Sequence, residues 1–432
     1  MAHEITMEDL ISMVTNFRFE DDHQTATPET PARPARPARP PKSKPEGWIK
    51  HDSYEDIKEL EHGSEAKTSL TKSTTTGKMY VVKRYFRFPV PEDNAAIQQC
   101  RRNPLPNEAT VLLKALRSHP NVLRAFGCDR VGPRRCDLYT EFCDGGDLQN
   151  KIRECRRHNL VAAEHFTLHV FISLTEALAY LHHGLRWDSE KEQYLQEPGF
   201  TSFIHGDIKP ENTFLRWSDK AERHGLPDVV LGDLGMSAPA DHYVGICGTS
   251  GYAAPEVQMI WDLEEMDPED RDPEAIKKVK HWHLTRATDI YSLGQTIHRL
   301  STNKYHAIGA DPGTTPVVAS EEGMIGVRLG CDPAWYESKA LTNVVQACLQ
   351  ANPVYRPEAL ENDLLEHVVL FKKELEKQVA MRQKARANQV ARRQLEMKIK
   401  QLTKELLGMK LSDTDLPAMK QAATKKPTRQ SM

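Results

Sequence analysis

The sequence predicts an α+β fold, in which a β-rich segment is followed by a mainly helical one. Two runs rich in β-branched and aromatic residues, 79–85 and 137–142, lie in the first third of the globular region. Apolar residues at helical spacing dominate later, over residues 166–181 and 289–300. The 432-residue chain is 39% hydrophobic and 28% charged, which is typical of a globular protein. We expect the globular region between about residues 48 and 370.

Residues 1–47 are expected to be disordered. Seven prolines fall between Pro28 and Pro45, most of them in Pro-Ala-Arg repeats. Such a basic, proline-rich stretch favours an extended polyproline II conformation and cannot form a packed core. It acts either as a spacer or as a ligand for a partner with an aromatic groove, such as an adaptor domain.

One helix is expected between the two β-like runs. Its apolar face would be formed by residues at helical spacing, namely Val111, Leu112, Ala115 and Leu116.

A long basic helix is expected over residues 371–410, followed by a disordered tail over residues 411–432. Between Phe371 and Lys410 there is no proline, and twelve Lys or Arg residues stand against four Asp or Glu. Leucine and isoleucine follow coiled-coil spacing for barely two heptads, which is too short to predict a coiled coil. The helix is therefore either a solvated helix or a surface for self-association or a partner.

Charge and cysteine content exclude several classes of protein. The net charge of −3 gives no global attraction to nucleic acid. Eight cysteines are scattered without a CxxC pair, which argues against a structural zinc site or a disulfide framework. We therefore expect reduced thiols and an intracellular protein, cytoplasmic or nuclear. No segment has the roughly 20 apolar residues that a membrane span needs.

The strongest chemical signal is a pair of polar loops that lie beside short apolar runs. Residues 205–212 read His-Gly-Asp-Ile-Lys-Pro-Glu-Asn, and residues 233–235 read Asp-Leu-Gly. Phosphoryl transfer requires a carboxylate beside the attacking hydroxyl, a cation near the transferred group and oxygen ligands for magnesium. Side chains of these types occur in the two loops at Asp207, Lys209, Asn212 and Asp233.

With further motifs, these loops resemble the eukaryotic protein kinase family. Residues 248–256 read Gly-Thr-Ser-Gly-Tyr-Ala-Ala-Pro-Glu, like the end of the family's substrate loop. Asp289 resembles the helical aspartate that braces the catalytic loop, and Arg356 would be the buried partner of Glu256. The resemblance covers about residues 54–365.

The resemblance implies a two-lobed protein kinase-like fold. A small, β-rich N-lobe would span residues 48–142, and a larger, helical C-lobe would span residues 143–370.

The resemblance also implies the catalytic roles. Asp207 would be the base or hydroxyl orienter, and Lys209 would stabilise the transferred phosphoryl group. Asn212 and Asp233 would hold Mg²⁺. Lys209 is of the type found in serine/threonine kinases, and the hydroxyl of Thr249 would tie the substrate loop to Asp207 and Lys209.

Six residues are implied for binding ATP. Lys83, in Tyr-Val-Val-Lys, would hold the α- and β-phosphates and pair with Glu108, and Gly63 would belong to the glycine-rich loop. The hinge would be formed by Glu141 to Cys143, after a small Thr140. Asp147 closes the hinge, where it would contact the ribose or a basic substrate residue.

Two departures from the family pattern bear on activity. The glycine-rich loop retains Gly63 alone, with Glu61 and Ala66 at the flanking glycine positions, and this favours weaker phosphate binding. Gly206 stands where many members have an arginine that answers a phosphate on the activation loop. Without that arginine, we expect a kinase that is not switched by phosphorylation at Ser237 or Tyr243.

The predicted function is ATP-dependent phosphorylation of serine or threonine in a protein substrate. A catalytically weak or inactive pseudokinase scaffold is the alternative, because of the degenerate glycine-rich loop and the two terminal extensions. A small-molecule hydroxyl kinase is a further alternative, since His-Gly-Asp also occurs in such enzymes.

Overall fold

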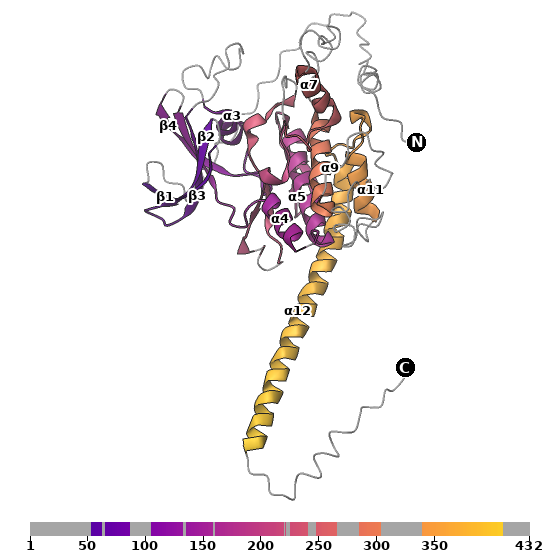
Figure 1. Ribbon diagram of the computed structural model, residues 1–432. Helices are drawn as coiled ribbons and strands as arrows, with labels where there is room; N and C mark the ends of the chain where they lie inside the picture. Colours follow the sequence, from indigo (N-terminus) through magenta and orange to yellow (C-terminus); the bar gives the residue numbers. More distant parts are fainter. Residues whose placement is uncertain are drawn as a thin grey trace, which may run out of the picture. The chain divides into compact units, whose positions relative to one another are not determined.

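The computed structural model describes residues 53–62, 65–86, 105–132, 135–158, 160–219, 221, 225–240, 248–265, 285–303 and 339–408. The chain divides into two units, residues 1–375 and residues 376–432. In the first unit, a β-sheet lies on one side and a set of helices on the other (Figure 1). This arrangement is the predicted two-lobed fold.

The N-lobe is built on a five-stranded antiparallel sheet with the order β1-β2-β3-β5-β4. Its strands are β1 (Tyr54–His62), β2 (Ala66–Ser73), β3 (Met79–Tyr85), β4 (Ala125–Gly132) and β5 (Arg135–Glu141). Tyr80 and Val82 of β3 are fully buried, and this alternation places Lys83 on the opposite face of the strand.

The helix predicted around Val111 is short and irregular. It consists of α3 (Asn107–Thr110) and a π-helical turn over Val111–Ala115. The backbone N–H of Leu116 donates to the carbonyl of Val111, five residues earlier. Such turns are uncommon and occur most often beside functional sites.

The prediction that the thiols are reduced is wrong for Cys128 and Cys136, which form a disulfide between β4 and β5. The two cysteines are only eight residues apart and lie on paired strands, with Cys128 opposite Leu138 and Cys136 opposite Arg130. The sequence spacing did not reveal this diagonal pair because it depends on the register of the hairpin.

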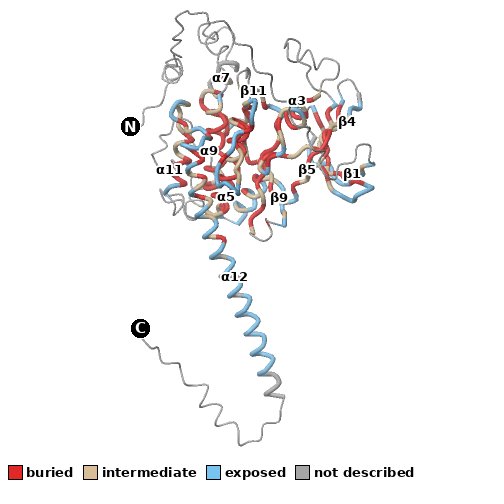
Figure 2. Tube along the Cα trace, turned by 180° about the vertical axis from the view of Figure 1, so that it is seen from behind, coloured by how far each residue is buried: buried red, intermediate tan, exposed pale blue. Residues whose placement is uncertain are grey.

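The C-lobe is organised around a buried helix, α5 (Glu164–His183). Most residues of α5 are buried, as expected of a helix at the centre of a core (red in Figure 2). It ends at Gly184, which has a φ of 70° and no room for a side chain beside Phe200. The surrounding helices are α4 (Leu148–Arg157), α7 (Pro255–Glu265), α9 (Arg286–Thr302) and α11 (Lys339–Cys348).

Short strand pairs carry the polar loops. In chain order they are β6 (Leu185–Asp188) with β7 (Gln193–Gln196), β8 (Phe203–Ile204) with β11 (Ala238–Pro239), and β9 (Thr213–Arg216) with β10 (Asp228–Leu231). The loop containing Asp207 connects β8 to β9, and Asp233 follows β10. These pairings place the loop of Asp207 next to the loop of Asp233.

The last helix, α12 (Leu364–Gly408), begins before the predicted basic helix. Its first turns belong to the first unit, where Phe371 packs against Phe171 of α5. In the second unit, all described side chains between residues 381 and 403 are exposed (Figure 2). The predicted linker at residues 1–47 and tail at residues 411–432 lie outside the described residues. Within the described part of the chain, no helix is long and apolar enough to span a membrane.

Candidate active site

The loop that carries Asp207 is held in place by a buried carboxylate. Asp289 of α9 accepts hydrogen bonds from the backbone N–H groups of His205, at 2.7 Å, and Gly206, at 2.9 Å. His182 of α5 donates its Nε2–H to the same carboxylate, at 2.9 Å. Burial raises the pKa of Asp289, but its interactions with His182, His205 and the backbone of Gly206 together outweigh this, so that the pKa lies below its ordinary value. The predicted brace is therefore present, and it is ionised.

Asp207 is buried, and its carboxylate accepts hydrogen bonds from three side chains. Oδ1 accepts from the Thr249 hydroxyl at 2.7 Å. Oδ2 accepts from Lys209 Nζ at 2.7 Å and from Asn212 Nδ2 at 3.0 Å. Lys209 also donates to Thr249 Oγ1, at 2.8 Å. The predicted tie between Thr249, Asp207 and Lys209 is thus confirmed, and it fixes the orientation of the carboxylate.

Lys83 joins the sheet to the helix and to the second polar loop. Its Nζ lies 2.9 Å from Glu108 Oε2 and 2.8 Å from Asp233 Oδ1. Glu108 is only 3% exposed, and its Oε2 also accepts a hydrogen bond from the Tyr85 hydroxyl at 2.6 Å. The contact expected between Lys83 and Glu108 is therefore present, although residues 87–104 between the two elements lie outside the described part.

Lys83 and Asp233 stabilise each other's charged forms. Burial lowers the pKa of Lys83, but the carboxylates of Glu108 and Asp233 overcome this and raise it above its usual value. Burial raises the pKa of Asp233, but Lys83, together with His205 and Lys209, outweighs this and lowers it. Lysine and aspartate are thus both charged at neutral pH.

Asp233 adopts a left-handed backbone conformation, with φ 56° and ψ 67°. Aspartate tolerates this conformation better than most residues, but the strain indicates that a particular direction of the side chain matters. The following loop is tied to α3, because Asn107 Nδ2 donates to the carbonyl oxygens of Gly235, at 2.9 Å, and Ser237, at 2.6 Å.

Asn212 and Asp233 have the chemistry of magnesium ligands. Asn212 uses its amide nitrogen for Asp207, and its Oδ1 accepts no hydrogen bond from any described residue. Asp233 likewise bonds Lys83 through Oδ1 alone. An amide oxygen and a carboxylate oxygen are the hard ligands that Mg²⁺ prefers, so these two residues fit the ion.

The side chains of Glu141 and Cys143, the predicted hinge residues, are engaged in contacts within the protein. Glu141 pairs with Arg216 of β9, at 2.5 Å, and accepts a hydrogen bond from the backbone N–H of Arg124. Cys143 is packed in a small apolar cluster with Leu123 and Val230, where burial raises the pKa of its thiol to about 12. The side chains of both residues are therefore occupied by contacts within the protein.

Asp147 caps the N-terminus of α4. Its carboxylate accepts hydrogen bonds from the backbone N–H of Asn150, at 2.6 Å, and from the Asn150 side chain, at 2.7 Å. Gly63 lies outside the described residues. Of the two positions that flank it, Glu61 is exposed, and Ala66 is buried in a cluster with Ala109 and Leu138.

Several supporting residues were not found from the sequence. Tyr85, Asn107 and Arg216 each act on a residue far away in the chain, so no local motif marks them. His182 lies in the last turn of α5, which carries several other polar residues, so the sequence alone does not single it out. The predicted buried pair of Arg356 and Glu256 is present, with two hydrogen bonds at 2.7 and 2.8 Å.

Comparison with known proteins agrees with this geometry. The family described as "Protein kinase domain" matches residues 54–370. The chain is 27% identical over 319 residues to the G2-specific protein kinase nimA of Emericella nidulans, a match that covers 68% of this chain and 40% of the relative. It is 28% identical over 212 residues to the human serine/threonine-protein kinase Nek2, covering 48% of this chain and 41% of the relative.

A further relative is the Aurora kinase of Yarrowia lipolytica, 29% identical over 212 residues that cover 48% of this chain and 46% of the relative. The chain thus spans less than half the length of each of these three relatives. The family match itself extends over most of the chain and includes both polar loops, Lys83 and Glu108. The chain therefore belongs to the eukaryotic protein kinase family.

Proposed function

We propose that this chain is a serine/threonine protein kinase that transfers the γ-phosphoryl group of ATP to hydroxyl groups of a protein substrate. The observation that carries the proposal is the oriented carboxylate of Asp207. Three side chains hold it, and one of them, Lys209, supplies the cation that phosphoryl transfer requires.

In this proposal, Asp207 orients the substrate hydroxyl and takes up its proton as the oxygen attacks the γ-phosphorus atom. The bond between that phosphorus and the bridging oxygen breaks, and ADP leaves with the electron pair. Lys209, 2.7 Å from Asp207 Oδ2, lies close enough to the hydroxyl to neutralise charge on the transferred group. The Thr249 hydroxyl, bonded to both side chains, holds Asp207 and Lys209 in a fixed relative orientation.

Nucleotide binding is assigned to the cluster around Lys83. Its ammonium group is held at a fixed position by Glu108 and Asp233, so it meets the α- and β-phosphates without further ordering. Asn212 and Asp233 would hold Mg²⁺, which screens the phosphate charges. The backbone of Glu141 and Cys143 would bind adenine, and Asp147 would lie near the ribose.

The loss of glycines from the glycine-rich loop leaves the other groups that bind the phosphates in place. Lys83, Asn212 and Asp233 supply most of the charge and metal ligation for the phosphates, and all three lie in the described part with the contacts given above. This set supports an active enzyme over the scaffold alternative, because a scaffold has no need for an oriented carboxylate and its cation.

The test is transfer of phosphate from radiolabelled ATP, with magnesium, to the full-length chain and to generic protein substrates. Acid hydrolysis should release labelled phosphoserine or phosphothreonine. Label on phosphotyrosine alone would contradict the serine/threonine assignment, and label on a small aminoalcohol but no protein would favour the small-molecule alternative. No transfer to any acceptor, with nucleotide bound, would favour the scaffold.

Two further proposals concern partners and location. The proline-rich residues 1–47 and the exposed helix α12 would recruit an adaptor or another partner. An intracellular location, cytoplasmic or nuclear, fits a kinase that draws on ATP.

A further inference from the structure

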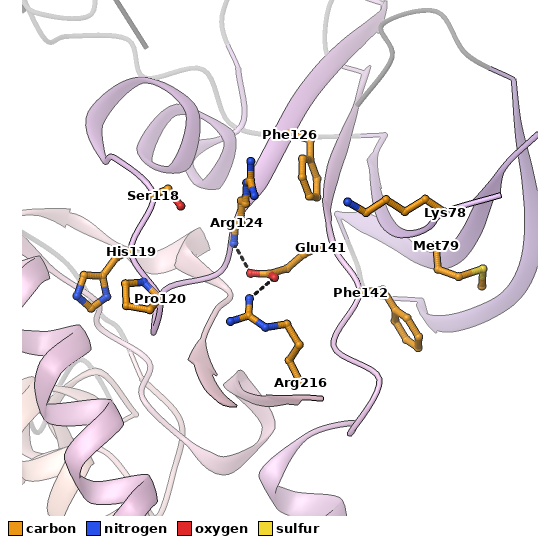
Figure 3. A pocket seen from close by; sticks show the side chains of 10 residues that line it. All are labelled: Lys78, Met79, Ser118, His119, Pro120, Arg124, Phe126, Glu141, Phe142 and Arg216. Carbon is orange, nitrogen blue, oxygen red and sulfur yellow. Dashed lines mark hydrogen bonds and ion pairs between the residues drawn. The ribbon is translucent and has the colours of Figure 1, made fainter. Parts of the chain in front are cut away.

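Behind the hinge lies a cavity of about 360 Å³ that the phosphoryl-transfer chemistry does not use. It is formed by the start of β3, the turn before β4 and the first residues after β5, and Arg216 of β9 closes one side (Figure 3). This volume lies at the lower end of the range for ligand sites. The cavity therefore has room for one or two side chains of a ligand and not for a folded domain.

Strand register separates this cavity from the active site. In the pairing of β3 with β5, Val81 lies opposite Thr140, and Tyr80 lies opposite Glu141. Because side chains alternate along a strand, Glu141 points to the face opposite that of Lys83 and Thr140. Figure 3 shows the Glu141 carboxylate directed into the cavity, toward Arg216.

The cavity carries positive charge. Three cations, Lys78, Arg124 and Arg216, line it beside one carboxylate, Glu141. Arg216 is already paired, with Glu141 and with Asp228. Neither Lys78 Nζ nor the Arg124 guanidinium makes a hydrogen bond or ion pair with any described residue. Two cations are thus free to bind an anion.

Aromatic rings form the adjoining wall. The Phe126 ring is flanked by Lys78 Nζ, 5.3 Å from its centroid, and by the Arg124 guanidinium, at 5.1 Å. Phe142 lies on the other side of the cavity (Figure 3). The Phe126 ring holds the two cations in place, and both rings offer apolar surface to a neighbouring side chain of the ligand.

We propose that this cavity, lined by Lys78, Arg124, Phe126 and Phe142, is a second binding site of the kinase, which takes an acidic peptide segment of a partner protein. An anionic side chain, carboxylate or phosphate, binds Lys78 and Arg124, and an adjacent apolar side chain packs on the rings. Charge complementarity selects this occupant: an apolar peptide would leave two cations desolvated and unpaired, and a basic peptide would be repelled.

The experiment measures fluorescence anisotropy of labelled peptides with the full-length chain, first without and then with saturating Mg-ATP. The probes are Gly-Phe-Glu-Glu-Phe-Gly, its phosphoserine form Gly-Phe-pSer-Glu-Phe-Gly, and the basic form Gly-Phe-Lys-Lys-Phe-Gly. At least one acidic probe should bind, with an affinity that falls as salt is raised. Whichever of the two binds more tightly identifies the anion as carboxylate or phosphate. Equal binding of the basic probe would overturn the proposal, and so would displacement by Mg-ATP.

Variants locate the contact. The double change Lys78→Gln and Arg124→Gln removes both charges but keeps most of each stem, so binding should weaken about tenfold or more. The matched control is Lys72→Gln with Arg135→Gln, two exposed cations of the same sheet, which should bind as the wild type does. Equal affinity in the first variant, or an equal loss in the control, would refute the site.

A second readout does not depend on these variants. Amide hydrogen exchange of the wild-type chain should slow over residues 118–126 when the acidic probe binds. Protection confined to the loops around Asp207 would place the peptide in the substrate cleft, contrary to the proposal.

Discussion

Removing the hydroxyl of Thr249 isolates the contribution of the bridge to Asp207 and Lys209. Valine has nearly the same shape as threonine but can neither donate to Asp207 Oδ1 nor accept from Lys209. Both hydrogen bonds involve a charged partner, at 2.7 and 2.8 Å. Bonds of this kind contribute about 1.5–3 kcal/mol each.

We expect one such bond to be lost from the transition state, because the second partner reorients toward water or phosphate. Thr249→Val should therefore lower kcat by about 10- to 100-fold. The KM for ATP should change little, since Lys83 and the hinge are untouched. Thr249 is only half-buried, so the melting temperature should also stay close to that of the wild type.

Steady-state kinetics with a peptide substrate, together with thermal unfolding, measure these quantities. Thr249→Ser is the matched control, because it keeps the hydroxyl and loses only a methyl group. It should recover most of the activity. A fully active Thr249→Val, or a Thr249→Ser variant as slow as Thr249→Val, would refute the role of the hydroxyl bridge.

Three further predictions concern specificity, regulation and pH. Glu211 has a buried Oε2 without a hydrogen bond from any described residue, and such a carboxylate can bind a guanidinium group. On a peptide array, substrates with arginine before the phosphoacceptor should therefore be phosphorylated faster than those with glutamate, and Glu211→Gln should reduce this preference. Equal rates for the two peptides would contradict the prediction. Phosphatase-treated protein should stay active, because Gly206 offers no cation and the Ser237 hydroxyl is buried and donates to the His205 carbonyl; loss of most activity would disprove this. Burial, and to a lesser extent Arg186, lower the pKa of His119 to about 3, so the unfolded chain binds this proton more readily than the folded chain. The free energy of unfolding, measured with urea, should therefore fall as the pH drops below 6.5, by up to about 2 kcal/mol at pH 5. His119→Gln should make this pH dependence smaller.

The sequence was most informative where chemistry fixes both residue type and local spacing. Asp207, Lys209 and Asn212 lie within six residues, and their contacts follow from one tight turn, so the motif predicts their association. The segment around α5 was predicted because its apolar residues recur at helical spacing.

Long-range pairs were not predictable in the same way. Arg216 and Glu141 are 75 residues apart, and their contact depends on how β9 packs below the hinge. Tyr85 and Glu108 meet only because the sheet and α3 pack together. The disulfide between Cys128 and Cys136 and the π-helical turn likewise depend on strand register and backbone packing, which residue types alone do not specify.

The most direct test of the proposed mechanism compares Asp207→Ala with Asp219→Ala, an exposed aspartate of the same lobe. Phosphate transfer from ATP and nucleotide affinity are measured on each full-length protein with magnesium. We predict that Asp207→Ala loses about two to four orders of magnitude in turnover and still binds ATP, while Asp219→Ala matches the wild type. Wild-type and Asp207→Ala rates that coincide would contradict the account and favour a scaffold.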